Sequence, residues 1–298
     1  MIIKNFIKAA RLRTLPLSIS GIILGGFLAM SDGLFNSLIF SLALITTIGF
    51  QVISNFANDY GDGVKGTDAT RIGEERMVSS GKISPKQMKK AIVVTVIITI
   101  IFALLLIYES FGISNFGYSL LFFVLGIGSI VAAIKYTVGN LAYGYSGFGD
   151  LFVFIFFGLL SVLGSYFLFT KEIYFLLTLP AISIGLLSTA VLNLNNIRDY
   201  QNDKKSKKHT IVVKIGVKAA KRYHYCLLLF SFICSLSYVV LTFTKAVQFI
   251  FLLAYIPIVI HALVVYNNKE EFRLDSELKK VALSTFLFSV LLGLGQVL

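Results

Sequence analysis

Charged residues are scarce in this chain of 298 residues: they make up 14% of the sequence, whereas hydrophobic residues make up 56%. Soluble globular domains usually carry about 25% charged residues, and the mean hydropathy of this chain is +0.83. A chain this long and this apolar cannot cover a water-facing surface with polar groups. The composition therefore excludes a soluble enzyme, a disordered protein and a coiled coil, and it indicates a polytopic membrane protein.

Cysteine and histidine are also rare. The two cysteines, Cys226 and Cys234, lie in the same apolar segment, and they indicate neither a disulfide framework nor a zinc site. The three histidines are His209, His224 and His261. They lack the spacing of metal ligands, and we assign no chemistry to them.

Long apolar runs are abundant instead. A membrane-spanning helix needs about 20 mostly apolar residues, and nine segments qualify. They cover roughly residues 15–31, 36–57, 91–108, 116–134, 149–168, 174–195, 223–243, 247–266 and 281–297. We therefore expect an all-α membrane protein with nine transmembrane helices in a single domain over residues 1–298. No small-residue cleavage site follows the first run, which argues against a cleaved signal peptide.

The basic residues are distributed unevenly between the connections. Of the 27 Lys and Arg residues, 25 fall in the N-terminal segment and in residues 58–90, 135–148, 196–222 and 267–280. The alternate connections hold only Lys171 and Lys245. The positive-inside rule then places the N-terminus and the charged connections in the cytoplasm. The net charge of +12 is explained by this topology and by contact with anionic lipids, so we expect no nucleic-acid partner.

Two polar clusters lie at the ends of apolar runs, both on the side that we expect to be cytoplasmic. The first contains Asn55, Asn58, Asp59, Asp62 and Asp68, and the second contains Asn195, Asn196, Arg198, Asp199 and Asp203. Spacings of three and four residues place side chains on one face of a helix. Carboxylate and amide oxygens suit Mg²⁺, which commonly bridges to substrate phosphates. Each cluster is therefore a candidate metal and phosphate site.

Basic residues accompany both clusters: Lys65, Arg71 and Arg76 follow the first, and Arg198, Lys204 and Lys205 lie within or after the second. A metal ion together with Lys and Arg is the arrangement that holds and ionises a diphosphate. One alternative is that the acids simply face water, but two matching clusters four spans apart favour a site. Another is an ion-coupled transporter, whose acidic residues usually lie near the bilayer midplane rather than at one surface.

The motifs Asn58-Asp59-x-x-Asp62 and Asp199-x-x-x-Asp203 resemble the paired aspartate-rich motifs of the UbiA superfamily of intramembrane prenyltransferases. The resemblance also rests on residues 11–16, 58–68, 76–85, 144–158 and 195–216. Together these segments are most similar to the branch that uses 1,4-dihydroxy-2-naphthoate in menaquinone synthesis, and the block 147–158 is the best marker of that branch. A branch acting on 4-hydroxybenzoate or another lipid-soluble acceptor is the alternative.

The resemblance implies a nine-helix bundle in the cytoplasmic membrane, with cytoplasmic cap loops at about 58–90 and 196–222 over a cavity open to lipid. It implies Mg²⁺ as cofactor, and a polyprenyl diphosphate and an aromatic acceptor as partners. The implied reaction is transfer of the polyprenyl group to dihydroxynaphthoate with decarboxylation, giving demethylmenaquinone. Residue 66, where many members of the superfamily carry a third aspartate, is glycine, and Asp68 lies two residues beyond it.

The resemblance also implies roles for individual residues. The expected metal ligands are Asp59, Asp62, Asp199 and Asp203, completed by Asn55, Asn196 and Asp68. The expected diphosphate contacts are Arg76 and Lys135 first, then Asn55, Asn58, Lys65, Arg71, Arg198 and Arg13. The expected pocket for the allylic cation and the acceptor consists of Tyr136, Tyr143, Tyr145 and Phe148. Asp150 is the expected contact to an acceptor hydroxyl, although an acid at a helix N-terminus is also favoured by the helix dipole alone.

Overall fold

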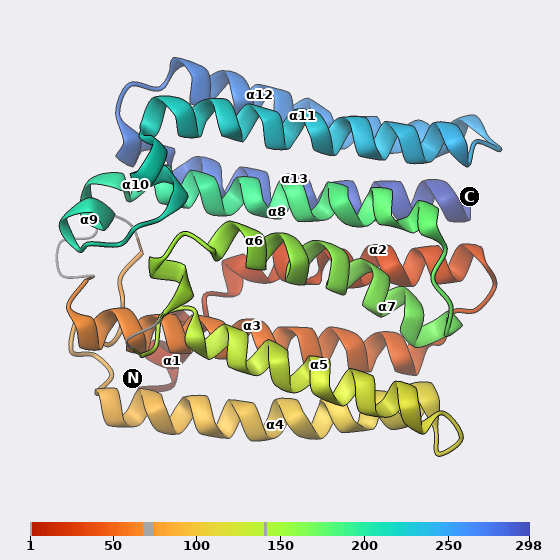
Figure 1. The fold of residues 1–298 in the computed structure, drawn as a ribbon, viewed down its shortest axis with the longest axis horizontal. Coiled ribbons are helices and arrows are strands. Elements are labelled where there is room, and N and C mark those ends of the chain that lie inside the picture. The colour runs from red at the N-terminus through yellow and green to blue at the C-terminus, as the bar shows by residue number, and fades with distance from the viewer. Residues whose placement is uncertain (1, 68–73, 140–141) are drawn as a thin grey trace.

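The computed structural model describes residues 2–67, 74–139 and 142–298 (Figure 1). Within these ranges the chain is helical and contains no strand. The longer helices are α2 (Leu15–Ser31), α3 (Ser37–Lys65), α4 (Pro85–Phe111), α5 (Phe116–Lys135), α7 (Ser161–Thr170), α8 (Thr178–Arg198), α11 (Val217–Leu241), α12 (Leu252–Asn267) and α13 (Asp275–Val297). The short ones are α1 (Ile2–Ala10), α6 (Gly149–Val153), α9 (Tyr200–Lys205) and α10 (Ile211–Ile215).

Short 3₁₀ turns connect several helices: η1 (Leu12–Thr14), η2 (Tyr143–Tyr145), η4 (Phe175–Leu177), η5 (Ala246–Phe251) and η6 (Glu271–Leu274). A π-helical segment, η3 (Phe154–Leu160), joins α6 to α7. The three pieces together form one continuous span over residues 149–170. Such π-helical segments are rare in proteins, and many of those that are found lie at functional sites.

In the described part of the chain, nine helical segments are long and apolar enough to cross a membrane. This confirms the predicted all-α fold with nine spans. Several helices nevertheless extend beyond the predicted bounds: α3 continues to Lys65 and α4 begins at Pro85. Hydropathy marks the part of a helix that meets lipid, whereas capping decides where the helix ends. Gly66 ends α3 with a left-handed φ of 73°, and Ser84 begins α4 with a capping box to Gln87.

The helices run along the long axis of the molecule, and the two termini lie at opposite ends of it (Figure 1). We call the end where α3 and α8 reach Lys65 and Arg198 the motif end, because both aspartate-rich motifs lie there. Helices α3, α4 and α5 pack together on one side of the bundle, and α8, α11, α12 and α13 on the other. Between the two groups, α2 packs against both α13 and α7.

Helices α2 and α7 approach each other closely. A Cβ atom on Gly25 would lie 1.9 Å from Ser165 Oγ, and one on Gly21 would lie 2.2 Å from Ser161 Oγ. Small residues at such a crossing let two membrane helices pack backbone to backbone. The close contact fixes the span 149–170, which forms one wall of the cavity described below.

A buried polar network joins α11, α12 and α13. His224 Nε2 lies 2.9 Å from His261 Nε2, and His261 Nδ1 lies 2.8 Å from Glu277 Oε2. The second carboxylate oxygen of Glu277 accepts a hydrogen bond from Lys280 Nζ at 2.5 Å. The two imidazoles and the carboxylate are almost fully buried. A buried network of this kind specifies how the three helices pack, because breaking one of its hydrogen bonds leaves a polar group unpaired in an apolar interior.

The network predicts that Glu277→Gln destabilises the bundle, because the substitution removes the charge that pairs with Lys280 and replaces one of the two acceptor oxygens with an NH₂ donor, so His261 and Lys280 cannot both keep an acceptor. We expect a loss of about 2 kcal/mol, the cost of weakening a buried charged hydrogen bond, seen as a lower thermal unfolding midpoint in detergent. Glu270→Gln is the control, because its ion pair with Arg273 is 48% and 66% exposed. An equal midpoint for the two variants would contradict the assigned role.

Candidate active site

A cavity of about 440 Å³ lies inside the bundle, with a polar end and a long apolar part. The polar end is lined by Asn55, Asn58, Asp62, Arg76, Asn195, Asn196, Asp199, Asp203 and Lys208. The apolar part is lined by residues such as Ile22, Ala43, Leu106, Phe122, Phe156 and Leu168. Between Ala43 and Asp62, α3 rises about 28 Å at the usual rise per residue. The cavity therefore extends over nearly the thickness of a bilayer core, about 30 Å.

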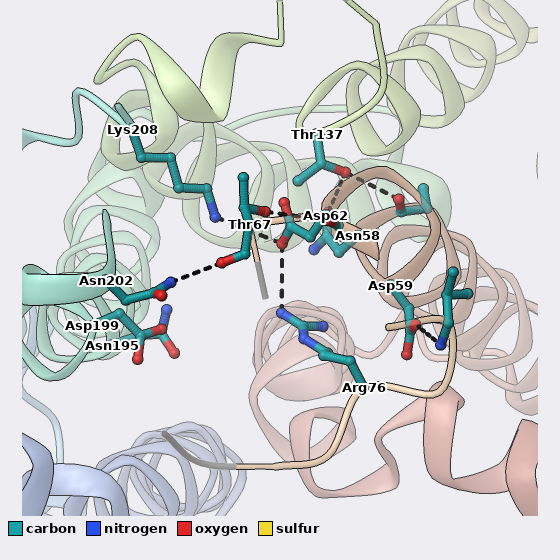
Figure 2. A network of polar contacts seen from close by, with 12 residues as sticks. Asn58, Asp59, Asp62, Thr67, Arg76, Thr137, Asn195, Asp199, Asn202 and Lys208 are labelled. Carbon is teal, nitrogen blue, oxygen red and sulfur yellow. Dashed lines mark hydrogen bonds and ion pairs between the residues drawn. The ribbon is translucent and has the colours of Figure 1, made fainter. Parts of the chain in front are cut away.

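Asp62 is the best-connected carboxylate of the first motif (Figure 2). The Tyr145 hydroxyl donates a hydrogen bond to Asp62 Oδ1 at 2.6 Å. Arg76 Nη2 and Lys208 Nζ lie 3.7 Å and 3.6 Å from Asp62 Oδ2. The Tyr145 ring also lies 4.2 Å from Lys65 Nζ and 4.8 Å from Lys208 Nζ, so it contacts two cations through its face. Asp62, Arg76 and Lys208 thus line one end of the cavity, and Lys65, which does not line it, contacts the Tyr145 ring.

The second motif has its own counter-charge. Arg198 Nε and Nη2 donate to the two carboxylate oxygens of Asp199 at 2.7 Å and 2.8 Å, and Arg198 Nη1 bonds to Asp275 at 2.5 Å. The Arg198 guanidinium is 1% exposed and does not line the cavity. Arg198 therefore orients Asp199 toward the cavity, whereas the sequence predicts a direct diphosphate contact.

The two motifs are joined across the cavity mouth. Asn202 Nδ2 of α9 donates to the Thr67 carbonyl at 3.0 Å, directly after α3 (Figure 2). On the other side, Thr137 Oγ1 donates to Asn58 Oδ1 at 3.1 Å, and Lys65 Nζ donates to the Thr137 carbonyl at 2.8 Å. Three connections far apart in sequence therefore meet around the acidic residues.

Aromatic side chains form the wall below the polar end. Tyr136 and Tyr143 both line the cavity, with ring centroids 5.3 Å apart, and Tyr143 stacks on Phe152 at 4.0 Å. Burial raises the pKa of both phenols well above the ordinary value, and for Tyr136 the nearby carboxylates, Asp150 first, raise the pKa further. Both hydroxyls are therefore neutral at physiological pH.

Of the predicted site residues, ten line the cavity: Arg13, Asn55, Asn58, Asp62, Arg76, Tyr136, Tyr143, Asn196, Asp199 and Asp203. Asp68 and Arg71 lie outside the described residues. Seven do not line it: Asp59, Lys65, Lys135, Tyr145, Phe148, Asp150 and Arg198. Lys65 and Tyr145 still reach the site through contacts with neighbouring residues, as described above.

Three of the other predicted site residues, Lys135, Phe148 and Asp150, lie away from the cavity wall, each in a different environment. Lys135 is exposed at the end of α5, whereas the next residue, Tyr136, faces inward. Phe148 is 55% exposed. Asp150 is buried at the start of α6, behind the cavity wall, where it interacts with the Tyr223 hydroxyl of α11. The contact of Asp150 with an acceptor hydroxyl stays a prediction, and the carboxylate does not reach the cavity in this structure.

Lys208 is the main residue that the sequence analysis missed. Four lysines occur between residues 204 and 208, and the sequence offers no signal that distinguishes them. The structure does: α9 ends at Lys205, Lys207 adopts a left-handed φ of 54°, and the Lys208 N–H bonds to the Asp203 carbonyl at 2.9 Å. This turn directs Lys208 back toward Asp62, whereas Lys204 and Lys205 are exposed.

The polar end suits a hard cation that arrives together with a phosphate. Its donors are carboxylate and amide oxygens, the ligands that Mg²⁺ prefers. In the described ranges, no three His, Cys, Asp or Glu side chains converge closely enough to hold a metal ion by themselves. Mg²⁺ typically uses one or two carboxylates and completes its shell with water and substrate phosphates. The donor set therefore fits Mg²⁺ bound jointly by protein and phosphate.

The sequence profile of the UbiA prenyltransferase family matches residues 19–290. The chain belongs to this family. The resemblance noted from the two motifs is thereby confirmed, and it extends over most of the nine spans.

Relatives cover nearly the whole chain. A 1,4-dihydroxy-2-naphthoate octaprenyltransferase of Haemophilus influenzae is 41% identical over 98% of this chain and 96% of its own length. One of Escherichia coli is 40% identical over 97% of this chain and 94% of its own length.

Solved structures support the fold. A UbiA homolog from Archaeoglobus fulgidus bound to DMAPP and Mg²⁺ has a TM-score of 0.70 at 14% identity, covering 98% of this chain and 99% of that one. The same homolog bound to GPP and Mg²⁺ has a TM-score of 0.66 at 12% identity, covering 96% and 99%. This similarity confirms the UbiA-type bundle.

The cations around Asp62 predict that Lys208 contributes to anion binding. In the presence of Mg²⁺, Lys208→Gln should weaken the affinity for inorganic pyrophosphate about tenfold, the loss typical of one charge-assisted hydrogen bond. Lys204→Gln is the matched control, because this side chain is exposed four residues upstream. Calorimetric titration of the purified proteins measures the difference, and equal affinities for the two variants would exclude a role for Lys208.

Proposed function

We propose that this protein transfers a polyprenyl group from an allylic polyprenyl diphosphate to 1,4-dihydroxy-2-naphthoate, with Mg²⁺ as cofactor. The observation that carries the proposal is one cavity, about 28 Å long, that combines acidic motifs, Arg76 and Lys208 at its polar end with a long apolar part. A diphosphate with a long hydrocarbon tail matches both parts. The choice of acceptor rests on the two relatives that are about 40% identical over nearly their full length.

The leaving group is the difficult part of this reaction, because breaking the bond between the allylic carbon and oxygen places additional negative charge on the diphosphate. When bound, Mg²⁺ supplies Lewis-acid neutralisation of that charge. Its proposed protein ligands come from Asn58, Asp62, Asp199, Asp203 and Asn196, and from Asp68. Arg76 and Lys208 lie 3.7 Å and 3.6 Å from Asp62, so the same two cations can contact a diphosphate bound beside it.

The allylic cation needs shielding from water and a polarisable wall. Tyr136, Tyr143 and Phe152 present such a wall, and aromatic faces attract cations. Because burial holds the pKa of both tyrosines well above the ordinary value, they offer π faces without a nucleophilic phenolate that would capture the cation. The wall thus stabilises the cation until the acceptor attacks.

The acceptor is an electron-rich hydroxylated ring. Its carboxylate-bearing carbon forms the new bond to the allylic carbon, within about 3–3.5 Å in a reactive geometry. The carboxylate then leaves as CO₂, and the electron pair of the broken bond restores the aromatic ring. The products are diphosphate, CO₂ and a prenylated naphthalenediol, the quinol form of demethylmenaquinone.

The same proposal includes an orientation. Because 25 of the 27 Lys and Arg residues lie on connections at one side, the motif end faces the cytoplasm, where a soluble diphosphate product is released. The N-terminus lies on the same side and the C-terminus on the opposite one. The protein is then a multi-pass enzyme of the cytoplasmic membrane.

The activity predicts a simple assay. Membranes containing the protein should prenylate 1,4-dihydroxy-2-naphthoate but not 4-hydroxybenzoate from a radiolabelled polyprenyl diphosphate, and EDTA should abolish turnover until Mg²⁺ is restored. Asp62→Asn should lower turnover by at least about 100-fold, because the site loses both a ligand and its charge balance. Glu75→Gln is the control and should leave turnover unchanged, because Glu75 is an exposed residue at the same end of the molecule. Full turnover in EDTA, or use of 4-hydroxybenzoate alone, would overturn the assignment.

The orientation predicts which cysteines react from which side. After Cys226 and Cys234 are replaced, Lys205→Cys and Glu270→Cys should react with an impermeant maleimide only in inverted vesicles, because these positions lie on charged connections. Glu172→Cys should react in intact cells, because it lies on a connection with one basic residue. Labelling of Lys205→Cys in intact cells would reverse the proposed orientation.

A further inference from the structure

Asp59 belongs to the first aspartate-rich motif, but its carboxylate does not face the cavity. Asp59 Oδ2 accepts a hydrogen bond from the Met77 N–H at 3.0 Å, and Oδ1 accepts one from the Val78 N–H at 2.8 Å. Asp59 is 1% exposed. Its carboxylate and that of Asp62 point in different directions (Figure 2). Both oxygens are therefore engaged by the backbone of the connection between α3 and α4.

We infer that Asp59 is a positioning residue, and not a magnesium ligand: it holds the segment 76–83 against α3 and thereby places Arg76 beside Asp62. This inference replaces the metal role that the sequence suggests for Asp59. It rests on the proposed transferase activity for its kinetic consequences, but its structural consequences are independent of that activity.

Helix geometry explains why neighbouring motif residues have different roles. Asn58 and Asp62 are four residues apart, so they lie one above the other on α3, and both line the cavity. Asp59 follows Asn58 directly and is rotated by about 100° around the helix axis. That rotation turns the Asp59 side chain toward the α3–α4 connection.

The rest of the segment confirms that it is docked on α3. Met77, Val78 and Ile83 are buried in one apolar cluster with residues of α3 such as Phe56 and Ala57. A Cβ atom on Gly63 would lie 2.7 Å from a Val78 methyl carbon, so the segment lies directly on the helix.

Arg76 immediately precedes the two amides that Asp59 binds. Fixing the N–H groups of Met77 and Val78 fixes the backbone from which the Arg76 side chain extends. The Arg76 side chain is 7% exposed and its Nη2 lies 3.7 Å from Asp62 Oδ2. A guanidinium held this way is preorganised for a phosphate, and the cost of ordering it is met during folding rather than on binding.

A double-mutant cycle separates positioning from metal binding. Asp59→Asn keeps one acceptor oxygen but directs an NH₂ group at a backbone N–H. It should raise KM for the polyprenyl diphosphate about tenfold while the Mg²⁺ concentration for half-maximal activity changes less than about twofold. In an Arg76→Gln background, Asp59→Asn should raise KM for the polyprenyl diphosphate by less than a further factor of about two. The two substitutions are not additive, because Asp59 acts only by positioning Arg76. Asp62→Asn is the comparison variant, and it should raise the Mg²⁺ requirement.

Two further measurements need no activity, so they distinguish failure of this inference from failure of the proposed function. In EDTA, trypsin should cleave Asp59→Asn after Arg76 or Lys82 faster than it cleaves the parent protein, whereas Asp203→Asn should leave these cleavages unchanged. In the presence of inorganic pyrophosphate, the parent and Asp59→Asn should bind the same number of Mn²⁺ ions by electron paramagnetic resonance.

A lower number of bound Mn²⁺ ions, an unchanged cleavage rate, or full additivity with Arg76→Gln would each overturn the inference and restore Asp59 as a ligand. If Asp59→Asn does not accumulate as folded protein, Asp59→Glu replaces it in all three measurements. This variant keeps both acceptor oxygens and the charge but moves them by one methylene group. We therefore expect KM and the cleavage rate to rise, by smaller factors than in Asp59→Asn.

Discussion

The buried carboxylate of Asp62 is the constraint on which the active end of this protein depends. An ionised group at the edge of an apolar bundle is tolerated only when hydrogen bonds and opposite charges compensate its lost hydration. The compensation comes from three connections: Arg76 follows α3, Tyr145 precedes α6, and Lys208 follows α9. Because these segments must converge on one carboxylate, the cavity acquires its cationic end and its aromatic wall together.

The two motifs differ in how tightly their charges are paired, and the difference suggests a division of labour. Arg198 binds Asp199 through two hydrogen bonds below 3 Å and is itself bound by Asp275. Arg76 and Lys208 lie more than 3.5 Å from Asp62. The first arrangement is a fixed support for a carboxylate. The second places two cations beside Asp62 at a longer distance, where a diphosphate bound next to the carboxylate can contact both.

The sequence predicted features that depend on neighbouring residues, such as the membrane-spanning helices. It did not predict side-chain positions that depend on residues far away in the chain. The nine spans followed from hydropathy. Helical spacing grouped Asp59 with Asn55 and Asp62, but only Asn55 and Asp62 of these three line the cavity. The helix ends were missed because caps at Gly66 and Ser84 set them. Lys208 was not predicted, and the sequence did not show that the side chains of Arg198 and Asp59 lie away from the cavity. A turn after α9, a carboxylate on α13 and two backbone amides respectively direct these three side chains.

The block 147–158, which the sequence analysis took as the marker of one branch of the family, occupies a defined place in the cavity wall. It leads into the π-helical turn η3, and Phe152, Phe156 and Phe157 of this stretch all line the cavity. A Cβ on Gly158 would lie 2.5 Å from the Gly185 Cα, so the turn rests directly on α8. Helix α8 also carries the second motif at its end. The same contact therefore joins the aromatic wall to the helix that leads into the second motif.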